Sequence, residues 1–321
     1  MRISTSFSHL QSVNAMLTQQ FKLARTQLQL STGERILTPA DDPSGSAKAL
    51  TLRKGVEQLR QFQNNIGVVR SRLALEETTL SSVTGVLHRV RELAVQGLND
   101  SNSQNDRKMI ATEILQLKDE LLGLANTKGP NGEYLFAGYA SKTKPFEETA
   151  ISVTTVTSTV DTFQYTYQGD ANNRTIPISA TTSLADSDDG LTVFGVPFDH
   201  GTPPSTLPSI PVSNSVFDVL NKLAADLTAD APDSAILDDL DGAAERVLEA
   251  RTVVGARLNA LDLQENINED VSLKLETFLS EIKDLDYAEA ISRFNLENVA
   301  LQAAQQAYIK VQGLSLFNFL R

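Results

Sequence analysis

A regular spacing of apolar residues between Leu52 and Gly97 constrains the fold of this chain more than any other feature. Two series of positions, each seven residues apart, cross this stretch without a proline, and Glu76 is their only charged member. The series are Leu52, Leu59, Ile66, Leu73, Leu80, Leu87 and Ala94, and Gly55, Phe62, Val69, Glu76, Val83, Val90 and Gly97. This pattern predicts one long α-helix that packs lengthwise against other helices.

A second long apolar pattern lies in the C-terminal half. It begins at Leu237, continues to Leu261, weakens at Glu265 and returns at Leu275. We expect this helix to pack along the first long helix. A helix of about 70 Å exceeds the diameter of roughly 50 Å expected for a compact globule of this chain length. The two patterns together therefore predict an elongated helical rod.

Shorter elements are expected between the two long helices. An amphipathic pattern from about Asp106 to Asn126 predicts a helix that forms an antiparallel hairpin with the preceding one. Residues 134–139 are predicted to form a strand, and residues 142–212, rich in Thr, Ser, Val, Gly and Pro, a small β-rich insert. Helix is expected to resume at Ser213 or Ser215.

Further heptad patterns occupy both ends of the chain, beyond breaks in the helical pattern. Gly33 is expected to end the first helix, and Asp42 to cap the long helix with Pro43 at its first position. The terminal helices can bury their aromatic side chains only against each other or against neighbouring molecules. The candidate assembly residues are Phe7, Leu10, Leu17, Phe21, Leu28, Tyr287, Phe294, Leu301, Tyr308, Val311, Leu314 and Phe317.

The predicted fold class is mainly α, with a coiled-coil rod formed by both halves of the chain and a small inserted β-rich domain. Three domains are expected. Residues 1–43 with 285–321 form a terminal coiled-coil assembly domain, residues 44–141 with 213–284 form a helical rod domain, and residues 142–212 form an inserted outer domain.

Charge and composition exclude several classes of partner. The formal net charge is −12, so nucleic acid and anionic membrane surfaces are disfavoured. No apolar run approaches the ~20 residues of a membrane span, and the first residues lack the apolar segment of a general secretory signal. There is no cysteine, which removes disulfides and thiolate chemistry.

The sequence indicates no catalytic residue, no cofactor and no metal site. No two of the three histidines have the spacing of a metal site, and Asp41 and Asp42 beside Pro43 fit helix capping better than acid–base chemistry. The stretch Asp186–Gly190 has its glycine one place early for a calcium loop, so a surface turn is expected. We therefore expect that the protein is not an enzyme.

Several short motifs resemble the flagellar hook-filament junction proteins, the hook-associated proteins of the third type within the flagellin superfamily. They occur in matching order at both ends of the chain, and the resemblance leaves out the β-rich insert. The motifs are Met1–Thr5, Ser31–Arg35 with Pro39–Pro43, Asn131–Tyr139, Leu301–Ala304 and Gly313–Phe317.

The resemblance implies a secreted structural protein between a hook-associated adaptor layer and the flagellin filament. It further implies export through the flagellar type III apparatus and terminal helices that fold on assembly. Its implied partners are copies of itself, an adjacent hook-associated protein, flagellin and an export chaperone on the C-terminal region. Three alternatives stay open, namely flagellin itself, an adhesive module displayed by the insert, and an intracellular coiled-coil scaffold.

Overall fold

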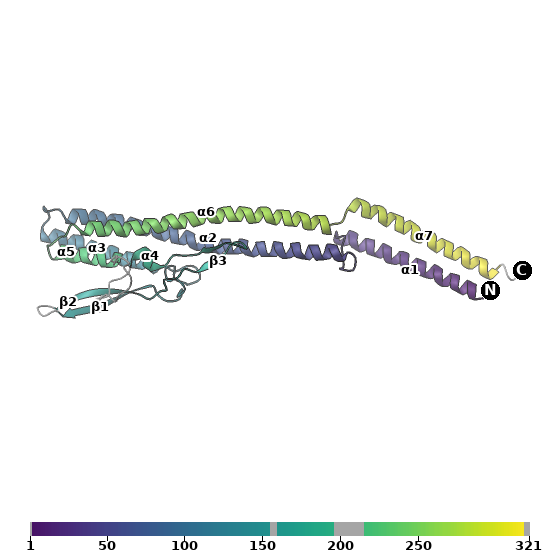
Figure 1. Ribbon diagram of the computed structural model, residues 1–321, viewed down its shortest axis with the longest axis horizontal. Helices are drawn as coiled ribbons and strands as arrows, with labels where there is room; N and C mark the ends of the chain where they lie inside the picture. The colour runs from purple at the N-terminus through teal and green to yellow at the C-terminus, as the bar shows by residue number, and fades with distance from the viewer. Residues whose placement is uncertain (1, 155–158, 196–214, 318–321) are drawn as a thin grey trace. The chain divides into compact units, whose positions relative to one another are not determined.

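The computed structural model describes residues 2–154, 159–195 and 215–317, and within these ranges the chain forms seven helices and four strands (Figure 1). The predicted mainly α fold is confirmed. In chain order the elements are α1 (Arg2–Thr32), α2 (Pro43–Gly97), α3 (Gln104–Ala125), β1 (Phe146–Thr154), β2 (Thr159–Tyr167), β3 (Thr175–Pro177), β4 (Ser183–Ala185), α4 (Gly190–Phe194), α5 (Val216–Thr228), α6 (Ile236–Lys283) and α7 (Tyr287–Phe317).

The chain divides into two compact units, one made of residues 1–60 and 269–321 and the other of residues 61–268. The boundaries between these units lie inside α2 and α6. The predicted domain boundaries lie elsewhere, at the breaks near Pro43 and residue 284, and that division into three domains stays a prediction.

In the unit of residues 61–268, α2 and α6 run antiparallel. Arg91 pairs with Asp241 at 2.7 Å, Glu77 with Arg251 at 2.6 Å, and Arg70 with Asp262 at 2.8 Å, so partner numbers rise along α6 as they fall along α2. The heptad residues of α2 in this unit are buried between these polar edges, including Ile66, Val69, Leu73, Leu80, Val83 and Val90. The expected pairing of the two long helices is confirmed for this unit.

The helix α3 packs back on α2 and beside α5. Arg89 of α2 pairs with Glu113 at 2.7 Å, and Arg107 donates to the Gly97 carbonyl at 3.2 Å, which gives the antiparallel hairpin predicted from the sequence. Ser215 caps α5, since its hydroxyl accepts a hydrogen bond from the Asp218 amide, whereas Ser213 lies outside the described residues. One of the two predicted starts of this helix is thereby confirmed.

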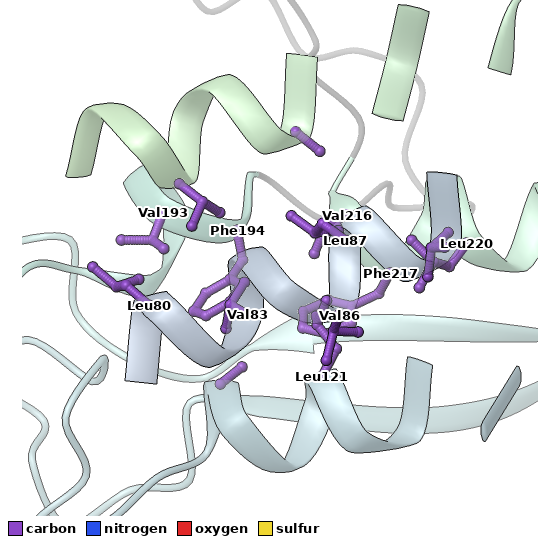
Figure 2. Close-up of a cluster of buried hydrophobic side chains, with 14 of the residues drawn as sticks. Leu80, Val83, Val86, Leu87, Leu121, Val193, Phe194, Val216, Phe217 and Leu220 are labelled. Carbon is purple, nitrogen blue, oxygen red and sulfur yellow. The ribbon is translucent and has the colours of Figure 1, made fainter. Parts of the chain in front are cut away.

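Aromatic residues from the predicted insert enter the helical core. Phe217 of α5 lies 5.2 Å from Phe146 and 5.1 Å from Tyr165, measured between ring centroids, and all three are buried. Phe194 of α4 joins them and lies beside Val83 of α2 (Figure 2). The interval 142–212 contains the four described strands, as two antiparallel pairs, but it shares one continuous core with α2, α3 and α5.

The strand predicted for residues 134–139 is wrong. Only Tyr134 forms a bridge, to Lys128, and the next three residues are buried in succession. A strand of a half-exposed sheet would alternate between core and solvent, so this segment instead crosses the core as a loop. Gly138 then turns with φ +59°, where a Cβ atom would collide with the Asp170 carbonyl.

Across the described ranges 2–154, 159–195 and 215–317, none of the helices combines the length and the apolar character needed to span a membrane.

Candidate assembly interface

Backbone hydrogen bonds join the two segments that follow α1 and α6 in the first unit. Gly33 ends α1 with φ +72°, and its carbonyl accepts from the Leu285 amide at 2.9 Å. The Arg35 amide donates to the Lys283 carbonyl at 2.7 Å, and the Lys283 ammonium pairs with Glu34. These bonds place the start of α7 beside the end of α1.

Two carboxylates hold the turn between α1 and α2. Asp41 accepts hydrogen bonds from the amides of Leu37 at 3.1 Å and Thr38 at 3.0 Å and pairs with Arg25 at 2.9 Å. The amide of Thr38, with help from the Arg25 charge, lowers the pKa of Asp41. Asp42 accepts from the Gly45 amide at 2.8 Å, and Pro43 is the first residue of α2. Both carboxylates therefore act on the backbone of this turn.

Substituting Gly33 by alanine is expected to lower the stability of this turn. The positive φ costs an alanine about 1 kcal/mol or more, and its Cβ atom would lie 2.8 Å from the Tyr287 hydroxyl. Thermal unfolding followed by circular dichroism measures the loss. The matched control is Gly67→Ala in α2, where nothing lies within 4 Å of the new Cβ atom and a gain of about 0.5–1 kcal/mol is expected. Equal melting temperatures for the two variants would contradict this account.

The helices α1 and α7 pack antiparallel within the first unit (Figure 1). The rings of His9 and Tyr308 are in contact near the chain ends, with centroids 5.2 Å apart, while Gly33 meets Tyr287 at the other end. Thr26 of α1 and Ala290 of α7 are buried between the helices. The half-buried residues that continue this contact are Val13, Met16 and Leu23 on α1 and Phe294, Leu301 and Tyr308 on α7.

The predicted assembly residues of α1 lie on a different face from the one that packs on α7. Their side chains are between 45 and 74% exposed, and their heptad spacing places them in one line along the helix. We call this line the apolar stripe of α1, and it consists of Phe7, Leu10, Leu17, Phe21 and Leu28. Of the two expected ways to bury them, packing against the C-terminal pattern is not seen for these five residues, and burial against neighbouring molecules stays a prediction. The physical reason is that α1 is apolar on two faces, and α7 covers the other one.

The predicted residues of α7 divide into three groups. Phe294, Leu301 and Tyr308 are half-buried against α1, whereas Tyr287 is exposed. The side chains of Val311, Leu314 and Phe317 lie outside what the structure describes. Sequence reasoning missed the exposed apolar residues on the side of α7 away from α1, which are Ile291, Leu296, Val299 and Ile309. Their only signal was apolar character outside the heptad positions.

Within the described part of the chain, no cluster of three or more His, Asp or Glu side chains has an arrangement that could hold a metal ion.

Two family models match the helical ends of the chain. The bacterial flagellin N-terminal helical region matches residues 3–141, and the bacterial flagellin C-terminal helical region matches residues 237–320. Neither match includes any part of the predicted insert, residues 142–212. They account for α1 to α3 on one side, and for α6 and α7 on the other.

Comparison over the whole chain decides the family. The chain is 30% identical to the flagellar hook-associated protein 3 of Escherichia coli K12 in an alignment 328 positions long, which covers 99% of each protein. The chain belongs to the flagellar hook-associated protein 3 family. The member from Salmonella typhimurium LT2 is 28% identical over the full length of both proteins. The fold agrees with a solved structure of a putative flagellar hook-associated protein from Vibrio parahaemolyticus, with a TM-score of 0.60, 21% identity and coverage of 76% of this chain and 100% of that one.

Proposed function

We propose that this protein is a structural subunit at the junction between hook and filament of the bacterial flagellum, and that the apolar stripe of α1 binds neighbouring subunits. Family membership supports the place in the flagellum. The exposed apolar stripe of α1 supports the second part, that contacts of this helix with neighbouring subunits hold the protein in place. The work of such a subunit is mechanical, and it requires no catalytic group.

The stripe is large enough to hold a subunit in an assembly. Fully burying one Leu or Phe side chain contributes roughly 1.5–3 kcal/mol, and five such residues lie in one line. A contiguous exposed patch of this kind marks an interaction surface. No acidic residue occurs in residues 1–33, so no carboxylate has to lose its hydration when a partner helix covers this part of the chain.

The neighbours that we infer are other copies of this chain, an adjacent hook-associated protein and flagellin. We further propose export through the flagellar type III apparatus, with a chaperone that holds the C-terminal region before secretion. The exposed apolar side chains of α7, such as Leu296 and Val299, are a surface that such a chaperone could cover. The subunit then lies outside the cell, in the flagellum.

Immunogold labelling of intact flagella tests the place of the protein. We expect one labelled band per flagellum, where hook and filament meet. The flagellin alternative requires label along the whole filament, and the intracellular scaffold requires the protein to be missing from sheared flagella. The two family models describe flagellin regions and do not separate the junction protein from flagellin. The two hook-associated relatives from Escherichia coli and Salmonella typhimurium, which match over at least 99% of both chains, favour the junction.

A further inference from the structure

Glu76 interrupts the apolar series of α2, and its side chain is completely buried. One carboxylate oxygen, Oε1, accepts a hydrogen bond from the Asp188 amide at 2.9 Å. The other, Oε2, has no hydrogen-bond partner among the described residues. An ionised carboxylate with one unpaired oxygen is costly in such a place, so the site favours the protonated acid.

Asp188 belongs to a segment that docks on the helices, residues 183–195, which we call the docking arm. It contains β4, the turn from Asp186 to Asp189, and α4. This turn is buried, so the surface turn expected from the sequence is wrong. Figure 2 shows Val193 and Phe194 of the arm beside Leu80 and Val83 of α2. Glu76 is thus a buried polar contact of α2 with the arm, which ion pairs and apolar packing also hold in place.

Charged groups from several elements lie around the contact between Glu76 and Asp188. Arg257 of α6 pairs with Asp188 at 2.7 Å, and Arg72 of α2 lies 3.3 Å from Asp186. The groups that face Glu76 or form the next layer are Arg72 on α2, Arg257 on α6, Glu133 on the loop after α3, Arg174 beside β3, and Asp186, Asp188 and Asp189 on the arm. Glu77 faces the edge of the bundle, where it pairs with Arg251.

The charges of this cluster do not balance when every carboxylate is ionised. Glu76, Glu133, Asp186 and Asp188 face the three guanidinium groups of Arg72, Arg174 and Arg257. Asp189 adds a further carboxylate, whose oxygens accept from the amide and hydroxyl of Thr192. One added proton reduces the excess of negative charge. Glu76 receives it most easily, because among the described residues it accepts only the Asp188 amide, whereas Asp186 and Asp188 each pair with a guanidinium group.

We propose that Glu76 is a proton-dependent latch, which holds the docking arm on α2 and α6 when it is protonated and loosens the arm when it is ionised. Burial, assisted by the charge of Asp188, raises the pKa of Glu76 from 4.5 to about 8. The docked state therefore binds the proton more tightly than the open state. The latch is complete below about pH 4.5 and weakens as pH rises, up to tenfold per unit, until about pH 8.

Amide hydrogen exchange of the full-length protein tests the latch. Peptides covering residues 183–195 are compared at about pH 6 and about pH 8, with rates corrected for intrinsic exchange. We expect the opening constant of the arm to rise by about tenfold or more in the wild type. In Glu76→Gln it should change by less than about twofold, since the amide resembles the protonated acid and does not titrate.

Glu77→Gln is the matched control, because it removes the neighbouring carboxylate, which lies at the edge of the bundle. Its arm should open with the same pH dependence as the wild type. Peptides from α3 provide an internal reference, and their corrected exchange rates should not change between the two pH values. A wild-type arm with no pH dependence beyond this reference, or a Glu76→Gln arm that keeps it, would overturn the proposal. If Glu76→Gln does not fold, the exchange rates of the wild-type arm at the two pH values test the proposal by themselves.

Discussion

A strain that produces only the Phe21→Asp variant is expected to lose attachment of the protein to flagella, and with it normal motility. Phe21 is 74% exposed, so the isolated chain should keep its free energy of unfolding to within about 0.5 kcal/mol. In the assembly the new carboxylate would be buried in the apolar stripe, at a cost of several kcal/mol per subunit. Immunoblots of sheared flagella and the melting temperature of the purified chain measure the two effects.

Ala15→Asp is the control for added charge. Ala15 is exposed on the same helix, and no residue of the stripe lies three or four positions from it. This variant should reach the flagellum and support motility. A Phe21→Asp protein that still attaches would contradict the role of the stripe, and a large fall in its melting temperature would mean that Phe21 is already packed in the isolated chain.

Replacing Phe217 by alanine should lower the free energy of unfolding by about 3–5 kcal/mol. Phe217 is fully buried, and its ring contacts those of Phe146, Tyr165 and Phe194. The substitution would leave a cavity where α5 meets three residues of the predicted insert. Urea denaturation followed by circular dichroism measures the loss.

Phe278→Ala provides the comparison, because the same atoms are removed from a half-exposed position on α6. It should cost no more than about 1 kcal/mol. If both variants lose the same stability, the aromatic cluster does not form a tightly packed core. If Phe217→Ala unfolds with the strands melting first and the helices unchanged, the insert and the helices do not share one cooperative core.

The amino-acid sequence alone determined the long helices and the break between α1 and α2, whereas the short helix α4 was not predicted. Local rules suffice there, because Gly33 can adopt a positive φ, Asp42 can cap a helix, and Pro43 suits a first turn. The heptad series of α2 likewise identified most of its buried residues between Ile66 and Ala94. These features depend on residues close in sequence, and the motifs at both ends indicated the family.

Only the tertiary structure decided which apolar face each terminal helix uses. On α1 the residues of the stripe and the group around Met16 and Leu23 are both apolar, and the position of α7 selects between them. The buried run at 135–137 is similar, since its burial comes from segments distant in the chain. The charge at Glu76 was visible in the sequence, but its partner Asp188 lies 112 residues away. The periodicity of apolar residues predicts which side chains lie on one face of a helix. It does not predict which distant segment packs on that face, because that depends on contacts between residues far apart in the sequence.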